Sequence, residues 1–187
     1  MIHIKSKKKA LEETIEEMRN FSFAYLNKYA SSKQQLKTYL LKKYLKSSIS
    51  TVKKNDISEL INLVIEDLEK TKLISDRFYS DSKAKTLIQR GNSINKIRNY
   101  LISKGIKDYH IKETINKIKE NNEDQDFFSA IKVCKKKRIG PAREQDNREL
   151  FYKKDISILA RSGFDFETSK KILEIEKDDY LRIVRLL

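Results

Sequence analysis

The side chains best placed to do chemistry in this sequence are cations. Lysine and arginine number 41 against 27 aspartates and glutamates, which gives a net charge of +14. Ammonium and guanidinium groups bind phosphates and carboxylates, so we expect a partner that is either nucleic acid or an acidic protein surface. The densest basic run after the N-terminus is Lys135, Lys136, Lys137 and Arg138. It either binds such a partner or complements the dipole at the end of a helix.

A second set of cations lies on or beside the segments expected to form the middle helix of three similar units. If these helices lie side by side, the cations form one basic stripe that a polyanion can follow. If they do not, each helix simply exposes its polar face to water. Arg77 is a separate candidate, because it can either bind a partner or tie two helices together. The candidates of the stripe are Lys42, Lys43, Lys96, Arg98, Lys104 and Arg161.

Residues that could form a catalytic or metal site are too few and too scattered. The chain has two histidines, His3 and His110, one cysteine, Cys134, and four isolated glycines. A metal or Cys–His site needs several ligands at fixed spacing, and a phosphate-binding loop needs clustered glycines. Carboxylate pairs such as Glu12-Glu13 are common on solvated helices. We therefore expect no enzymatic activity, no metal and no cofactor.

The same composition bears on compartment and assembly. A single cysteine excludes an internal disulfide and fits a reducing cytosol. The basic N-terminus has no apolar stretch after it, as a signal peptide would, and no apolar run approaches the roughly 20 residues that span a bilayer. Nothing resembles a heptad seam that would make a dimer. We expect a cytoplasmic monomer that does not enter membranes.

Helical periodicity dominates the chain, and only four glycines and one proline interrupt it. Two segments show a recognisable helix ending, a Leu four residues before a Gly that is followed by an apolar residue. These are Leu101 to Gly105-Ile106 and Leu159 to Gly163-Phe164. A similar order around Tyr44 precedes them, and the three turn positions stand 61 and 58 residues apart. This near-constant spacing predicts three copies of one helical unit.

The expected fold is all-α, with three tandem three-helix repeats in an elongated, curved array and a short C-terminal helix. Capping boxes are predicted at Ser32–Gln35 and Asp56–Glu59, with Ser75 and Ser93 as further N-caps. Tyr44 resists the left-handed state, so its helix is expected to run on and to be the longest of the three middle helices. The predicted segments are 1–13, a basic, flexible tail; 14–72, the first repeat; 73–122, the second; and 123–187, the third with the C-terminal helix.

In order and spacing, several short motifs resemble the RecX family of bacterial RecA regulators over about residues 15 to 176. The middle repeat matches best, with a D-x-R-F element, a glycine, and an L-x-x-K-G-I ending. In the first repeat Gln35 replaces the usual Glu of S-x-x-E-L. The segments that carry the resemblance are Ala24–Leu26, Ser32–Leu36, Asp76–Tyr79, Gly91, Ile94–Arg98, Leu101–Ile106, Lys137–Pro141 and Ala160–Phe164.

The resemblance implies a regulator that binds in the helical groove of the RecA–single-stranded DNA filament. It further implies inhibition of the ATPase, strand-exchange and coprotease activities of RecA, or a block of filament extension, with roles in homologous recombination, DNA repair and the SOS response. Direct contact with single-stranded or duplex DNA also fits the charge. A helical DNA-binding protein that acts without RecA is the alternative, and an adaptor for another acidic partner is a third hypothesis.

Overall fold

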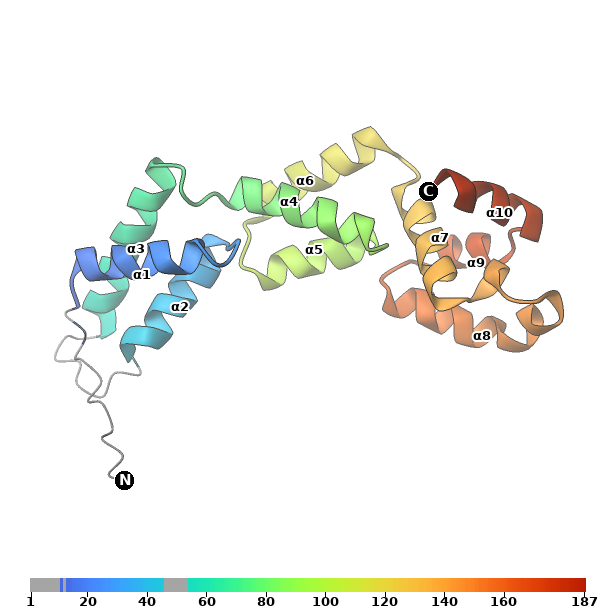
Figure 1. Ribbon diagram of the computed structural model, residues 1–187, viewed down its shortest axis with the longest axis horizontal. Helices are drawn as coiled ribbons and strands as arrows, with labels where there is room; N and C mark the ends of the chain where they lie inside the picture. Colours follow the sequence, from blue (N-terminus) through green and yellow to red (C-terminus); the bar gives the residue numbers. More distant parts are fainter. Residues whose placement is uncertain (1–10, 12, 46–53) are drawn as a thin grey trace, which may run out of the picture. The chain divides into compact units, whose positions relative to one another are not determined.

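Ten α-helices and one 3-10 turn make up the regular structure of the computed structural model in its described residues, which are 11, 13–45 and 54–187 (Figure 1). The prediction of an all-α protein is confirmed. The chain divides into two compact units, Met1–Tyr79 and Ser80–Leu187, which we treat one at a time. The basic run through Lys9 and the polar stretch 46–53 lie outside the described residues.

The first unit consists of α1 (Ile15–Leu26), α2 (Lys33–Leu45), α3 (Lys54–Lys70) and the first turn of α4 (Asp76–Gln89). Each of the first three helices turns one apolar stripe inward, as the i, i+3, i+4 spacing predicts. The side chains buried together between them are Met18, Leu36, Leu40, Tyr44, Ile57, Ile61, Val64, Ile65, Leu68 and Ile74.

The prediction that the helix of Tyr44 runs on past this residue is confirmed. Tyr44 lies inside the last turn of α2, which ends at Leu45, and its side chain is fully buried. The hydroxyl donates a hydrogen bond of 2.8 Å to the Glu17 carboxylate of α1. Burial and the Glu17 charge raise the pKa of Tyr44. The expectation that this is the longest of the three middle helices is wrong, because α2 has 13 residues and the later α8 has 17.

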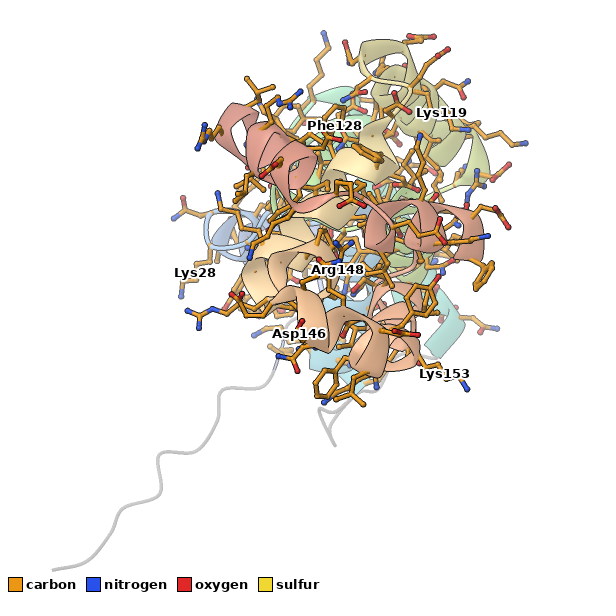
Figure 2. All side chains as sticks on the ribbon, turned by 90° about the vertical axis from the view of Figure 1, so that its right-hand side faces the viewer. Lys28, Lys119, Phe128, Asp146, Arg148 and Lys153 are labelled. Atoms are coloured by element: carbon orange, nitrogen blue, oxygen red, sulfur yellow. The ribbon has the colours of Figure 1, made fainter. Side chains whose placement is uncertain are left out.

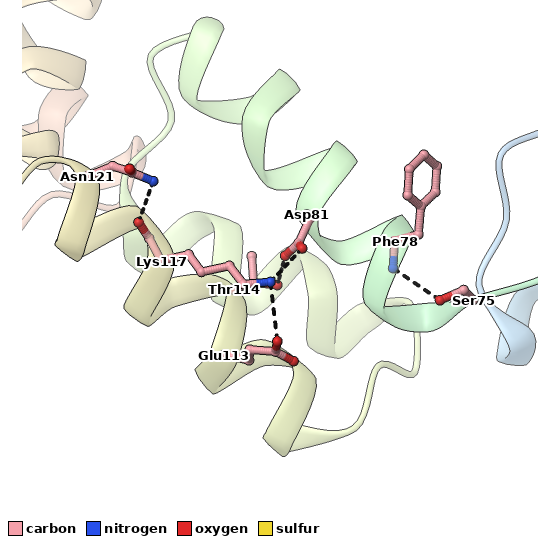
Figure 3. A network of polar contacts seen from close by, with 7 residues as sticks. All are labelled: Ser75, Phe78, Asp81, Glu113, Thr114, Lys117 and Asn121. Atoms are coloured by element: carbon pink, nitrogen blue, oxygen red, sulfur yellow. Dashed lines mark hydrogen bonds and ion pairs between the residues drawn. The ribbon is translucent and has the colours of Figure 1, made fainter.

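The second unit contains the rest of α4, a pair of helices that pack on it, and a C-terminal group of four helices. The pair is α5 (Ile94–Ser103) and α6 (Asp108–Asn121). Asp81 of α4 accepts hydrogen bonds from Thr114, at 2.7 Å, and from Lys117, at 2.8 Å, which fasten α4 to α6 (Figure 3). The group is α7 (Gln125–Lys137), α8 (Gln145–Arg161), α9 (Phe166–Leu173) and α10 (Lys177–Leu186), with a 3-10 turn at Gly140–Ala142. Three helices thus fall in each of the first two predicted repeats, but the repeat boundaries stay a prediction.

The two predicted glycine endings are confirmed in detail. Gly105 and Gly163 have left-handed backbones with φ of 72° and 90°. The following N–H group reaches back to the carbonyl four residues before the glycine, from Ile106 to Leu101 and from Phe164 to Leu159, each at 3.2 Å. In both endings the apolar residue after the glycine is buried with the Leu of the last helical turn, as this type of helix ending requires. The two pairs are Leu101 with Ile106 and Leu159 with Phe164.

The predicted N-caps are confirmed in three places out of four. Ser32 and Gln35 form a reciprocal capping box, with both hydrogen bonds at 3.2 Å. Ser75 caps α4 through the Phe78 N–H, at 3.3 Å (Figure 3), and Ser93 caps α5 through the Lys96 N–H, at 3.1 Å.

The prediction of a capping box at Asp56–Glu59 is wrong, because α3 begins earlier, at Lys54. Asp56 therefore lies in the first turn, where its charge complements the helix dipole.

An aspartate from a later helix adds a second cap to α2 and to α5. The Lys33 N–H donates to Asp76 Oδ1 at 2.9 Å, and the Ile94 N–H donates to Asp126 Oδ1 at 2.7 Å. In both cases the donor is the first residue of the middle helix of one predicted repeat. The acceptor lies in the first turn of the helix that opens the next repeat. These two bonds lie at equivalent points of the predicted repeats.

Candidate binding surfaces

The start of α5 is held between two other elements of the second unit. The turn after α8 lies against it, because a Cβ atom placed on Gly163 would stand 3.0 Å from Lys96 Cβ and would also meet Ser93 Oγ. Arg161 is the last residue of α8, two residues before Gly163, and is exposed, as is Lys96. Two cations that are far apart in the sequence therefore border one place on the surface.

The turn between α4 and α5 lies on α7. A Cβ atom on Gly91 would stand 3.1 Å from the Ser129 carbonyl oxygen and 3.2 Å from Lys132 Cβ. Arg90 precedes Gly91 and is exposed, while Lys136 follows Lys132 by one helical turn and is also exposed. We call this group of five residues the joint cations: Arg90, Lys96, Lys132, Lys136 and Arg161.

The carboxylates close to this group already serve as helix caps. Asp126 accepts the Ile94 N–H, and Asp165 caps α9 through the Thr168 N–H at 2.7 Å. Burial raises the pKa of Asp126; the charge of Asp165 adds to this, while the Ile94 bond and Lys119 act against it. The five joint cations outnumber these two carboxylates, so this surface has an excess of positive charge. Such a surface suits a chain of phosphates or an acidic protein segment.

The other predicted cations of the second unit are spread over α5 and the end of α7. Lys135 and Lys137 are exposed, and Arg138 has a left-handed backbone, with φ of 53°, where α7 ends. Arg98 is half-buried on α5. The Lys104 ammonium lies 5.1 Å from the centre of the Tyr100 ring. Of the predicted residues in this unit, Lys96 lies at the contact with the turn that follows Arg161, and Lys136 lies one helical turn beyond the contact of Gly91 with α7.

The predicted cations of the first unit lie on α2 and at the start of α4. Lys42 is exposed, and the Lys43 ammonium lies 3.6 Å over the centre of the Phe21 ring. Arg77 is exposed in the first turn of α4, beside the capping Asp76. Whether these residues bind a partner stays a prediction.

Arg90 and Lys132 belong to the joint but were not among the predicted residues. Arg90 belongs to no motif, and Lys132 lies three residues before the basic run Lys135–Arg138 but outside it. Their role depends on the contact of Gly91 with α7, which joins residues about 40 apart in the sequence. A pattern restricted to one helix gives no signal for such a group.

Groups of three or more histidine, cysteine or acidic side chains able to hold a metal ion are absent from the part of the chain that the structure describes. Cys134 is buried, and burial raises the pKa of its thiol to about 12, so the thiolate is disfavoured at neutral pH. The His110 ring packs on the Tyr109 ring at an angle of 44°, with ring centres 4.0 Å apart, and His3 lies outside the described residues. Among the described helices, none has the length and apolar character to span a membrane.

The chain is similar to known proteins in sequence and in structure. No protein-family model matches it. Regulatory protein RecX of Myxococcus xanthus (strain DK1622) is 28% identical over 160 residues, which cover 84% of each chain. The crystal structure of RecX from Lactobacillus salivarius matches with a TM-score of 0.60 and 16% identity, covering 95% of this chain and all of that one. A second crystal structure of regulatory protein RecX matches with a TM-score of 0.59 and 18% identity over 86% of this chain and 74% of that one. The resemblance to the RecX family that the sequence motifs indicated is thus confirmed, by one relative in sequence and by two solved structures in fold.

Proposed function

We propose that this protein regulates the RecA recombinase in the cytoplasm by binding the RecA–single-stranded DNA filament in its helical groove. There it inhibits the ATPase, strand-exchange and coprotease activities of RecA. The observation that carries the proposal is the similarity to regulatory protein RecX along 84% of both chains. We propose that it acts as a monomer, which light scattering would report as a mass near 22.1 kDa.

The distribution of charge supports this proposal. Exposed cations occur on both units, on α2 in the first and at the joint in the second. Several weak contacts linked in one chain reinforce one another, because each bound contact raises the effective concentration of the next. Positive charge also speeds the encounter with a DNA-loaded filament and makes binding weaken with salt.

Sedimentation of the filament tests the binding step. RecA is assembled on long single-stranded DNA with a slowly hydrolysed nucleotide, and the labelled protein is added at a ratio well below one per RecA. We expect it to sediment with the filament at a salt concentration where it no longer binds the same DNA without RecA. Equal binding to the filament and to naked DNA would contradict a RecA-directed role.

A second candidate function is DNA binding without RecA, which the net charge of +14 and the joint cations favour. A protein of this kind binds single-stranded or duplex DNA tightly at moderate salt, with a steep salt dependence. Fluorescence anisotropy with labelled DNA of both kinds, in the absence of RecA, measures this directly. Tight binding in this assay, together with no effect on the filament, would favour the second candidate.

A further inference from the structure

An apolar groove of about 600 Å³ lies in the first unit, between the C-terminal half of α1 and the turn that follows α3. Its lining carries no charged side chain and consists of Phe23, Ala24, Leu26, Asn27 and Leu73. Leu26 also packs against the core, so the floor of the groove is fixed to the body of the unit. Pockets for ligands in proteins commonly have volumes of this order.

Two large apolar side chains in the groove are left in contact with water. Phe23 is 42% exposed and Leu73 is 56% exposed. Leu73 follows a left-handed residue, Lys72, with φ of 59°, and its N–H reaches back to the Leu68 carbonyl at 2.9 Å. This is the same helix ending that Gly105 and Gly163 make, where the apolar residue after the turn is buried. At the end of α3, Leu73 is instead exposed, so it does not bury itself against the last turn of the helix as the equivalent residues do.

The rim of the groove is positively charged. Lys28 adjoins Asn27, and Lys70 and Lys72 lie just before Leu73; all three are exposed. The side chain of Lys28 reaches away from the ribbon (Figure 2). Two acids of α3 near this end are paired: Asp67 is bound to Arg19 at 2.9 Å and Glu69 to Lys33 at 2.7 Å, so their charges are largely compensated. An uncharged apolar floor with a lysine rim selects an occupant that combines apolar side chains with negative charge.

We propose that this groove docks an acidic, amphipathic segment of a partner protein, with apolar side chains on Phe23 and Leu73 and carboxylates facing Lys28, Lys70 and Lys72. A groove of this kind receives one face of a helix through residues spaced at i, i+3, i+4 and i+7. A nucleic acid is not the expected occupant, because its charge is uniform and it offers no apolar stripe. The surface lies outside the joint cations, so it is an addition to the proposed function.

A labelled helical peptide of about 15 residues, with leucines on one face and glutamates on the other, is the probe. We expect the full-length protein to bind it at low salt, and we expect F23S/L73S to bind it about tenfold or more weakly. The double variant K28E/K70E removes the complementary charge and should weaken binding to a similar extent. Phe23, Leu73 and both lysines are exposed, so circular dichroism should show unchanged helicity in the variants.

Three matched controls make the test decisive. Leu63→Ser removes a leucine on α3 that is 53% exposed but outside the groove, and it should bind the acidic peptide normally. A peptide of the same composition with the leucines spread around the helix should bind poorly, as should one with lysine in place of glutamate. Equal binding of both acidic peptides, or of wild type and F23S/L73S, would overturn the proposal. Because no RecA is present, failure here is separate from failure of the proposed function.

Discussion

Asp155 is a charged residue whose carboxylate is held entirely by neighbouring donors. Its side chain is buried on α8 and accepts the Gly140 N–H at 2.8 Å and two hydrogen bonds from Arg143, at 2.7 and 2.8 Å. Arg143 in turn lies 4.5 Å from the centre of the Phe151 ring. This network fixes the turn at Gly140-Pro141 between α7 and α8.

Removal of the Asp155 carboxylate should be strongly destabilising. Asp155→Ala leaves a guanidinium and a buried N–H without their acceptor, so we expect the free energy of unfolding to fall by about 3–5 kcal/mol. Glu149→Ala, an exposed position on the same helix, should change it by about 0.5 kcal/mol or less. Urea unfolding followed by circular dichroism measures both. A loss at Asp155 no larger than that at Glu149 would contradict the assigned network.

Two substitutions of Asp126 separate the contribution of its hydrogen bond to the free energy of unfolding from the contribution of its charge. Its pKa is raised above the ordinary value of 3.8, mainly by burial, so the folded state binds the proton more tightly than the unfolded state. Its contribution to stability is therefore present below the unfolded pKa and is lost as the pH rises through the folded pKa. Asp126→Asn keeps an acceptor for the Ile94 N–H and removes this pH dependence, whereas Asp126→Ala loses the cap.

Asp126→Ala and Asp126→Asn should therefore differ in stability. At pH 7 we expect Asp126→Ala to lower the free energy of unfolding by about 1 kcal/mol and Asp126→Asn to leave it nearly unchanged or to raise it slightly. In urea titrations from pH 3 to pH 7, the free energy of unfolding of Asp126→Asn relative to wild type should increase as the pH rises. An equal loss of stability in both variants at pH 7 would mean that the ionised carboxylate itself is needed.

At the scale of elements, Gly163 serves both a helix ending and the contact between the α8–α9 turn and α5. Gly163→Ala introduces a side chain at φ of 90° and places its Cβ against Ser93 and Lys96. Gly105→Ala has a similar positive φ, of 72°, at an exposed position. We expect each to cost about 1–2 kcal/mol for the left-handed backbone, with a further loss for Gly163 alone. Thermal unfolding of both variants checks this, and equal losses would contradict the contact.

The joint cations form a surface only because three elements meet there, so their binding role also belongs at this scale. Lys96→Gln with Arg161→Gln should weaken binding to the filament or to single-stranded DNA and reduce the salt slope of log K by about 1.4, at about 0.7 per phosphate contact. Lys153→Gln with Arg185→Gln removes the same charge from exposed positions on α8 and α10 (Lys153 is labelled in Figure 2). The two double variants should therefore differ. If they weaken binding equally, net charge and not the joint is responsible.

The elements also show what the sequence could and could not predict. The glycine endings and the serine caps depend on residues within one turn, so their spacing alone was sufficient. The aspartate caps on Lys33 and Ile94 join residues 43 and 32 positions apart, and no local pattern marks them. The continuation of α2 past Tyr44 was predicted from the residue type, whereas the greater length of α8 was not. The joint was found only in part, since Arg90 and Lys132 have meaning only through a tertiary contact.

At the scale of the whole molecule, the proposed function requires that both helical units of the chain present cationic positions to a nucleoprotein filament. The similarity to RecX proteins extends along most of the chain, so the two units are expected to act together. Binding through several weak contacts should be more sensitive to salt than binding through one apolar patch. An effect that persists unchanged at high salt would not fit this arrangement.

The ATPase activity of the RecA–single-stranded DNA filament is the most direct measure of the central claim. The protein is titrated into a steady-state assay at moderate salt, from far below one molecule per RecA up to equimolar, with the Lys96→Gln/Arg161→Gln and Lys153→Gln/Arg185→Gln variants run beside it. We predict that wild type and the second variant inhibit hydrolysis well below stoichiometric amounts, and that the first variant needs about tenfold more protein. No inhibition by wild type at any ratio up to equimolar would contradict the claim that this protein regulates RecA.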